Sequence, residues 1–515
     1  MATDLLPLAV VLPLFGAVAT VVAVRPRRAR EMPGSADGSE SNVSSGPLGI
    51  TATPALPVVG IATAALTTIV ALAIAAGVWQ GGPGRLEIGG WGVPLGIALE
   101  ADGLSAALLI MANLVALCTS VYATSYFGAS DKQLHFWPLW LLLWAALNGL
   151  FLSADLFNLY VMLELLGLAA AALGALTGSR EAVAANLRYL LVGLLGSMTY
   201  LLGVALMYAA HGELDIGLLA SALRDASQAG PVDPVALALM TGGLALKAAL
   251  FPLHFWLPPA HANAPAPVSA ALSALVVKAA VYLILRLWLS LFAPVTTAAA
   301  ALLLGLLGAA AVLWGSWRAL RAERLKLLAA YSTVAQIGYL FLFFPLLAAT
   351  PPGPAYDNLV AALVLMALTH GFAKAGLFLA AGSIQQSAGH DRVDQLGGTA
   401  QRLPATIFAI GLAGIALIGL PPSGSFIGKW LLMQGAIETG QWGWIVVVLA
   451  GTLLAAAYVF RVLIRAFGLE PTPLHFVTDA RVEIPALLLA LVAVAVLGLG
   501  SGPLWTLLGF DGGRT

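Results

Sequence analysis

The stretch ALKAALFPLHFWLPPAHANAPAP, residues 245–267, combines features that seldom occur together in an apolar sequence. Lys247 stands within an apolar run, Pro252 follows five residues later, and two histidines, His254 and His261, come after the proline. A proline inside a helix removes a backbone donor and clashes with the preceding turn. The stretch therefore predicts a charged side chain beside a broken helix.

The composition of the whole chain places this break inside a membrane. Of the 515 residues, 60% are hydrophobic and only 9% are charged, and the mean hydropathy is +0.94. An apolar stretch of 18 or more residues is long enough to cross a hydrocarbon core of about 30 Å as a helix. We therefore expect an all-α polytopic membrane protein with fourteen spans. The expected spans are residues 5–24, 54–77, 102–127, 135–153, 155–177, 184–210, 235–257, 265–291, 297–317, 326–348, 357–386, 404–434, 441–467 and 482–509.

The placement of lysine and arginine between these spans predicts the orientation of the chain, because short cytoplasmic loops are enriched in both residues. One side carries sixteen of them, with Lys326 as a boundary case, and the other side carries four. The four are Arg85, Arg224, Arg286 and Arg514. The asymmetry predicts an even number of spans, both termini outside and the basic loop at residues 25–50 in the cytoplasm.

Several classes of function find no support in the sequence. Its one cysteine, Cys118, excludes an internal disulfide framework and a cysteine-based zinc or iron–sulfur site. No nucleophile–base pair, phosphate loop, metal cluster or cofactor motif is present. The loop at residues 25–50 is rich in Gly and Ser and lacks the apolar content to fold alone. We therefore expect no enzyme, no cofactor, no bound metal and no nucleic-acid partner, and we look for the function inside the membrane.

Five charged residues remain embedded in apolar sequence: Glu164, Lys247, Lys278, Lys374 and Lys429. A charge at the centre of a membrane helix costs about 2.5–3.5 kcal/mol on insertion scales, so such residues face a bundle interior or water and are paired. One such lysine could be a structural helix–helix pair. Five together favour proton transfer, because a buried lysine whose partner moves away can exchange its proton.

The pairing of these charges is only partly decided by the sequence. Glu164 lies midway along its apolar stretch, so its partner is expected to be a lysine, but spacing alone does not say which one. Asp155 stands where a helix begins, and an acid at that place is typical of a cap rather than a proton carrier.

A second break is predicted at GLPPSGSFIGKW, residues 419–430, where Pro421 and Pro422 precede Lys429. The order is the reverse of the first break, in which the lysine precedes the proline. A mirrored order is typical of inverted-topology repeats, although two proline kinks could also arise independently. We expect the repeats at residues 135–291 and 292–467, with three helices before them at 1–134 and a final helix within 468–515.

Further polar residues could connect the two breaks. The imidazoles of His254 and His261 follow the first break, and histidine exchanges protons near neutral pH. His370 lies four residues before Lys374 and so shares its helix face. Ser332, Gln336 and Tyr339 could hold water between the carriers. Each of these polar residues could instead only hold the bundle together by hydrogen bonds.

The segments that carry these residues resemble those of a known family. LSADLFNLYVMLELLGLAA (152–170), the stretch from Ala245 to Arg286, LKLLAAYSTVAQIGYL (325–340), LTHGFAKAGLFLAAGSI (368–384) and the second break are similar to signature segments of the antiporter-like subunits of complex I, membrane-bound hydrogenases and Mrp-type sodium/proton antiporters. The D-subunit branch of the Mrp-type antiporters is the most similar. The resemblance covers most of the chain. The loop at 25–50 departs from the family in its length.

The resemblance implies a fold of fourteen helices with two inverted five-helix repeats and with helices 7 and 12 broken. It implies that Glu164 pairs with Lys247, that Lys278 relays protons toward Lys374, and that Lys429 controls the exit. His254 falls at a polar position of the family just beyond the first break. His261, Ser332, Gln336 and His370 form a secondary polar path.

The function implied by the resemblance is a proton-translocating subunit of a multisubunit sodium/proton antiporter in the cell membrane of a prokaryote. Its expected partners are other membrane subunits, the lipid bilayer, protons and a monovalent cation. The alternative is the equivalent proton-pumping subunit of a complex I or hydrogenase assembly. A structural subunit with an inactive channel, or a stand-alone solute carrier, is disfavoured by the complete set of five charges and by the shortage of specific ligand groups.

Overall fold

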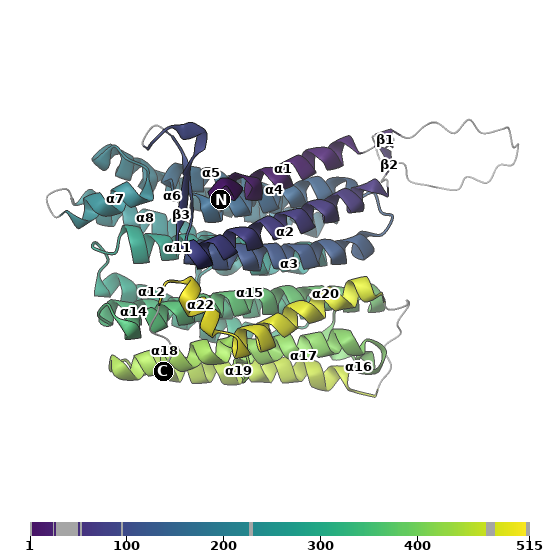
Figure 1. Cartoon of the computed structure of the whole chain (residues 1–515). Helices are drawn as coiled ribbons and strands as arrows, with labels where there is room; N and C mark the ends of the chain where they lie inside the picture. The colour runs from purple at the N-terminus through teal and green to yellow at the C-terminus, as the bar shows by residue number, and fades with distance from the viewer. Residues whose placement is uncertain are drawn as a thin grey trace, which may run out of the picture.

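The fold is a bundle of long helices. A computed structural model describes residues 3–23, 25–26, 50–51, 54–93, 96–225, 230–469 and 479–510. The long helices lie side by side with their axes along one common direction; the purple N-terminal helix lies on one flank of the bundle, and the yellow C-terminal helices run across its middle (Figure 1). Apart from the two-residue strands β1 (Arg25–Pro26) and β2 (Ile50–Thr51), the polar loop predicted at 25–50 lies outside the described residues.

The helices up to the first break follow the predicted order. They are α1 (Leu6–Val22), α2 (Ala55–Gly81), α3 (Gly103–Phe127), α4 (Gln133–Leu152), α5 (Leu156–Gly174), α6 (Arg180–His211), the short α7 (Ile216–Arg224) and α8 (Val232–Lys247). As predicted, Asp155 caps a helix: its carboxylate accepts a hydrogen bond from the backbone amide of Asn158 at the start of α5 (2.7 Å).

The second half contains longer and more deeply buried helices. After α9 (Leu257–Asn263), a continuous segment runs through α10 (Ala266–Ala271), a π-helical turn (Leu272–Val276), α11 (Val277–Arg286) and a second π-helical turn (Leu287–Leu291). The remaining helices are α12 (Ala298–Arg321), α13 (Leu325–Phe341), α14 (Phe343–Ala349), α15 (Pro354–Ala388), α16 (Thr399–Arg402), α17 (Pro404–Ile418), α18 (Gly424–Glu438), α19 (Gly443–Ala466), α20 (Ala480–Leu491), α21 (Leu497–Leu499) and α22 (Gly502–Leu507).

Twelve helices among the described residues are long and apolar enough to cross a membrane. The two expected spans that are missing from this set are 235–257 and 404–434, where the chain breaks: α8 stops at Lys247, and α17 and α18 are separate short helices. Each piece on its own is therefore too short to cross a membrane. The count of fourteen spans and the inverted repeats stay predictions.

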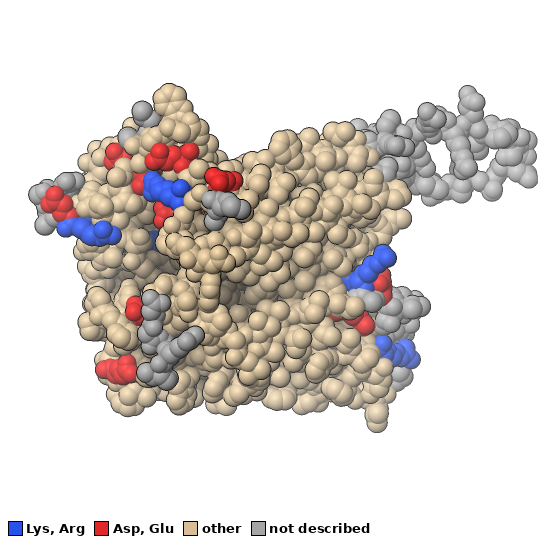
Figure 2. Space-filling model, in the orientation of Figure 1, with Lys and Arg blue, Asp and Glu red and all other residues tan. Residues whose placement is uncertain are grey.

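The surface fits a bundle that is surrounded by lipid. On the face shown in Figure 2, Lys, Arg, Asp and Glu gather at the two ends of the helices, and a broad band between them carries none. Large apolar side chains are exposed along this band; Val22, Leu453 and Ile464, for example, each expose more than half of their surface. Such a band is unfavourable in water and favourable in hydrocarbon. The chain is a multi-pass membrane protein.

The helix α15 forms the centre of the bundle. It packs against α3, α10, α13, α17, α18 and α20, and the most apolar window of both α15 and the segment 266–291 is completely buried within the protein. A buried membrane helix does not need an apolar surface all round, because its neighbours can supply hydrogen-bond partners. The two segments that carry Lys278, His370 and Lys374 are therefore shielded from lipid.

At the end of the bundle near the hairpin of β3 (Gly84–Glu87) and β4 (Ala98–Ala101), an ion pair joins α11 to the start of α3. Arg286, which falls within the expected span 265–291, lies in the last turn of α11, where its guanidinium binds both carboxylate oxygens of Asp102 and its Nε donates to the Tyr282 hydroxyl (3.0 Å). Asp102 also caps α3 by accepting from the Ser105 amide. Burial alone would raise the pKa of the Asp102 carboxyl, but Arg286 and Ser105 lower it below its ordinary value.

We predict that Arg286→Ala destabilises the protein. Removing one partner of a buried ion pair lowers the free energy of unfolding by about 3–5 kcal/mol. Because 18% and 24% of the two side chains remain exposed, we expect a smaller loss of about 2–3 kcal/mol. The measurement is denaturant unfolding of the detergent-solubilised chain. The matched control is Arg392→Ala, whose pair with Asp394 is about half exposed and should contribute little to stability, because solvent screens it. Equal effects of the two variants would contradict the prediction.

Candidate functional site

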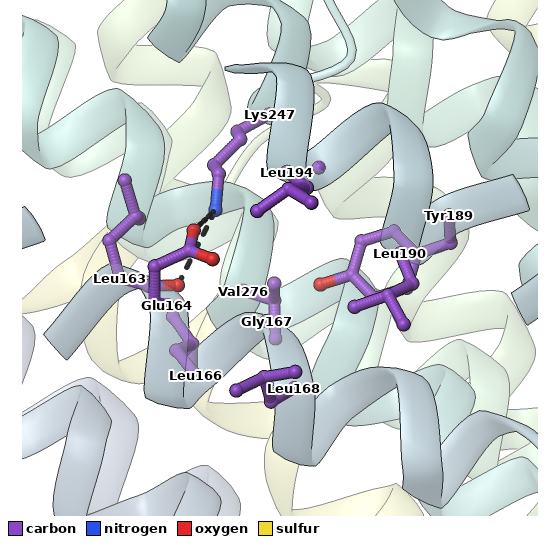
Figure 3. A pocket seen from close by; sticks show the side chains of 11 residues that line it. Leu163, Glu164, Leu166, Gly167, Leu168, Tyr189, Leu190, Leu194, Lys247 and Val276 are labelled. Carbon is purple, nitrogen blue, oxygen red and sulfur yellow. Dashed lines mark hydrogen bonds and ion pairs between the residues drawn. The ribbon is translucent and has the colours of Figure 1, made fainter. Parts of the chain in front are cut away.

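The predicted pair of Glu164 and Lys247 forms at the first helix break. The ammonium of Lys247, the last residue of α8, donates to Glu164 Oε1 (3.1 Å) and to the Leu163 carbonyl (3.4 Å) on α5. The two side chains are 10% and 21% exposed. Figure 3 shows the pair at one side of a pocket between α5 and α6, whose other lining side chains are apolar apart from Tyr189. The pair is therefore reachable from the pocket without being open to bulk water.

Glycines let Lys247 reach across to α5. The helices α6 and α8 cross at Gly196 and Gly243, where a Cβ added to either residue would lie 2.7 Å or less from the carbonyl oxygen of the other. Small residues at such a crossing allow two backbones to approach closely. Beyond Lys247 the chain leaves the helix: Ala249 has a φ of 55°, and a 3-10 turn (Leu253–Trp256) follows Pro252. The break thus fixes Lys247 at the end of α8.

The second predicted carrier, Lys278, meets a histidine on α15. Its Nζ lies 2.7 Å from His370 Nδ1, and both side chains are buried. The other ring nitrogen of His370, Nε2, is buried without a hydrogen-bond partner. Since Lys374 lies one turn further along the same helix, His370 stands between the two lysines. It was predicted on the secondary path, and the structure places it in direct contact with Lys278.

The third carrier, Lys374, is held by neutral oxygens of α13. Its ammonium donates to the Ala329 carbonyl and to Ser332 Oγ (2.6 Å), and it lies 5.3 Å from the centre of the Phe378 ring. Lys374 is completely buried. Ser332, predicted as a water-holding residue, therefore contacts a carrier directly.

The fourth carrier, Lys429, is held at the second helix break. Its Nζ donates to the Ile418 carbonyl (2.8 Å), which ends α17, and to Thr452 Oγ1 on α19 (3.0 Å). It also lies 4.2 Å from the centre of the Tyr339 ring. The chain turns at Gly419 with a φ of 81°, and Ser423 then caps α18. The carbonyl freed by the break is thus the one that binds the lysine, as expected for ion-binding broken helices.

The charges in this row are unevenly balanced. Within the part of the chain that the structure describes, Lys247 is the only one of the four lysines in an ion pair. Lys278, Lys374 and Lys429 bind an imidazole, hydroxyls and carbonyls. A proton on any of the three is therefore stabilised only by dipoles, and each added charge acts on its neighbours through a medium of low dielectric constant.

Two of the predicted histidines make no hydrogen bond to a lysine of this row among the described residues. His254 stacks on Phe251 (5.4 Å between ring centres) and faces Arg318, and no hydrogen bond joins it to a carrier lysine among the described residues. His261 is completely buried against Phe378 (5.0 Å), and neither of its ring nitrogens has a hydrogen-bond partner. The boundary residue Lys326 is 2% exposed and donates to the Ala264 carbonyl, so it is buried at the end of α13 rather than in a loop.

Sequence reasoning did not find some of the groups that hold the carriers. Gln336, which it did find, donates to the Leu417 carbonyl (2.8 Å). Thr452 and the backbone oxygens of Ala329 and Ile418 carried no signal, because a single threonine in an apolar helix and a backbone carbonyl are not distinguishable from their neighbours in sequence. The broken helix at 419–423 was the one indication that a carbonyl near Lys429 would be free.

Comparisons with known proteins identify the relatives of the chain. Residues 153–455 match the family described as NADH:quinone oxidoreductase/Mrp antiporter, transmembrane. NADH-quinone oxidoreductase subunit N of Desulforudis audaxviator is 38% identical over 84% of this chain and 86% of its own length. The D subunit of the Na(+)/H(+) antiporter of Alkalihalophilus pseudofirmus is 28% identical over 85% of this chain and 87% of its own. A chain of the Mrp complex from Dietzia sp. DQ12-45-1b superposes with a TM-score of 0.85, at 27% identity, over 99% of this chain and 96% of that chain.

The Glu164–Lys247 geometry predicts a strong energetic coupling. Glu164→Gln leaves a buried ammonium without its counter-charge, whereas Glu164→Gln with Lys247→Met removes both charges. A double-mutant cycle on unfolding free energy should give a coupling of about 1–3 kcal/mol. The same cycle with Glu164→Gln and Lys429→Met, which share no partner, should be additive within about 0.5 kcal/mol. Additivity in the first cycle would contradict the pairing.

Proposed function

The chain belongs to the NADH:quinone oxidoreductase/Mrp antiporter family of membrane subunits, and from this premise we propose that it translocates protons as a subunit of a multisubunit monovalent cation/proton antiporter. The observation that carries the proposal is the row of Lys247, Lys278, Lys374 and Lys429, with His370 between the middle two, buried in the bundle and held at two helix breaks. The D-type antiporter subunits and the Mrp complex among its relatives support the antiporter function.

The mechanism begins at the pair of Glu164 and Lys247. A proton that neutralises Glu164, or a movement that separates the pair, leaves the Lys247 charge without compensation. That charge repels a proton on Lys278. Lys278 then passes this proton through the His370 ring to Lys374. The imidazole can do this because it binds a proton at one nitrogen and releases it from the other.

The second half of the mechanism ends at Lys429. A proton that reaches Lys374 moves on toward Lys429 and leaves there to the other side of the membrane. When the Glu164–Lys247 pair closes again, the first half of the row can accept the next proton. Coupling therefore needs no large movement, because charges separated by low-dielectric protein act on one another strongly.

The exchanged cation, which we propose to be sodium, requires partner subunits. A hard cation binds several oxygen ligands, but Glu164 is the one carboxylate that the sequence places at mid-membrane, and Lys247 occupies it. We therefore assign the cation path to another membrane subunit of the same assembly. By the distribution of Lys and Arg, both termini lie outside the cell membrane and the 25–50 loop lies in the cytoplasm.

We further propose that the two breaks belong to inverted repeats at residues 135–291 and 292–467. In the first repeat the lysine ends the helix before the break, and in the second it lies on α18 after the break. This reversed order is expected if the second repeat enters the membrane upside down. The row of carriers would then run from the helix break of one repeat to the oppositely oriented helix break of the other.

A second candidate function is the proton-pumping subunit of a redox-driven complex. It is favoured by the relative named NADH-quinone oxidoreductase subunit N, which is 38% identical to this chain. The same row of carriers serves both functions, since what differs is the source of energy in partner subunits. In either case this chain acts as a transporter subunit and binds no redox cofactor.

We predict that Lys247→Ala abolishes cation-driven proton movement. The measurement is collapse of a proton gradient on addition of sodium, in everted vesicles from an antiporter-deficient host that expresses the whole gene cluster. The unaltered cluster should respond and the variant should not, because the first carrier is lost while the other subunits remain.

The matched control is Lys132→Ala, which removes an exposed lysine at the start of α4 and should leave the response unchanged. Equal assembly of the three clusters is checked by affinity purification. An unaltered cluster without any cation response would favour the redox-driven function, and a fully active Lys247→Ala variant would overturn the proposed path.

A further inference from the structure

Among the described residues, no direct hydrogen bond connects Lys374 with Lys429. Lys374 donates to Ser332 Oγ, and Lys429 donates to the Ile418 carbonyl and to Thr452 Oγ1. No hydrogen bond among the described residues connects Ser332 with the Lys429 side. A proton that has reached Lys374 therefore needs another group before it arrives at Lys429.

A buried tyrosine lies in this gap. Tyr458 projects from α19, which packs against α12, α13, α17 and α18, and its side chain is completely buried. Its hydroxyl lies beside Ser332 and Gln336 but makes no direct hydrogen bond to either of them. Tyr458 is thus the neighbour that Ser332 and Gln336 share.

The unpaired hydroxyl is difficult to explain by stability alone. A buried hydroxyl without a partner costs about 1–3 kcal/mol, and a phenylalanine would fill the same space without that penalty. Unpaired buried polar groups in native structures are few and call for an explanation, such as an unobserved water or a functional role.

Beyond Tyr458, Gln336 adjoins the site of Lys429. The amide of Gln336 donates to the Leu417 carbonyl (2.8 Å), and Lys429 donates to the next carbonyl along the chain, that of Ile418 (2.8 Å). Gln336 and Lys429 therefore bind two consecutive carbonyls at the end of α17. Since its amide nitrogen is used on Leu417, the Gln336 oxygen remains available to accept from water.

We propose that the Tyr458 hydroxyl carries protons between Lys374 and Lys429, an inference that rests on the proposed function. Lys374 gives a proton to Ser332 Oγ as the hydroxyl proton of Ser332 passes to Tyr458. Tyr458 passes its own proton to a water molecule held by Gln336, and that water gives a proton to neutral Lys429. One N–H bond breaks at Lys374 and one forms at Lys429, and every oxygen ends neutral.

The test is Tyr458→Phe in the complete assembly, assayed by sodium-driven collapse of a proton gradient in everted vesicles. The substitution keeps the ring and removes an oxygen that makes no direct bond, so assembly should be unchanged. Positioned proton-transfer groups contribute about 10²-fold or more to rate; because water can partly replace the hydroxyl, we expect the initial rate to fall roughly tenfold or more.

The matched control is Tyr122→Phe on α3. Tyr122 is also completely buried, and its hydroxyl lies beside Ser383, which follows Lys374 by nine residues on α15, without a direct hydrogen bond. Loss of the Tyr122 hydroxyl should leave the initial rate of gradient collapse within about twofold of that of the unaltered assembly. A similar loss in both variants would show a general effect of buried hydroxyls and would overturn the proposal.

The remaining outcomes are also decisive. An active unaltered assembly with an equally active Tyr458→Phe variant overturns the proton-carrying role and leaves the proposed function standing. An inactive unaltered assembly overturns the proposed function itself. Failure of Tyr458→Phe to assemble would show that the hydroxyl has a structural bond, and it would overturn the proposal for that reason.

Discussion

The structure depends on how a charge is held where no water surrounds it. Lipid supplies no hydrogen-bond partners, so each buried ammonium must find oxygen or nitrogen within the protein. The two helix breaks supply part of this need. At the first break the end of α8 presents Lys247 to Glu164, and at the second the end of α17 offers the Ile418 carbonyl to Lys429. An unbroken helix would have used that carbonyl in its own hydrogen bonds.

The shortage of acids in this row is what the proposed proton relay requires. If every lysine had a carboxylate partner, each proton would be fixed in a local ion pair. Instead Lys278 faces His370, and Lys374 faces Ser332 and a carbonyl. Neutral partners of this kind can accept either a charged or an uncharged amine, provided that some of them can turn or bind water. The single pair of Glu164 and Lys247 then acts as the element whose opening changes the field along the row.

Much of this arrangement could be predicted from sequence, because charges and prolines inside apolar runs are conspicuous. The five charges and both breaks were identified in this way, and the expected partner of Glu164, left open by spacing, is Lys247. The sequence could not show that His370 lies against Lys278, since the two residues are 92 positions apart on different helices. It also could not show that Arg286 binds Asp102, because the two residues are 184 positions apart.

The groups that lie beside and between the carriers were the least predictable from the sequence. Thr452 and Tyr458 are ordinary residues of an apolar helix, and only the packing of α19 against α13 and α17 brings them to the carriers. The proton-path role of His254 stays a prediction. Its place after the break suggested that role, and the turn at Leu253–Trp256 places its ring against Phe251 and near Arg318.

The central claim is that one row of buried carriers conducts protons from Lys247 to Lys429. It is tested most directly at His370, whose Nδ1 lies 2.7 Å from Lys278 Nζ. The measurement is the rate of sodium-driven proton movement in vesicles that contain the assembled His370→Leu variant, with all four lysines retained. The account predicts a rate close to background at an unchanged level of assembly. A rate close to that of the unaltered assembly would contradict it.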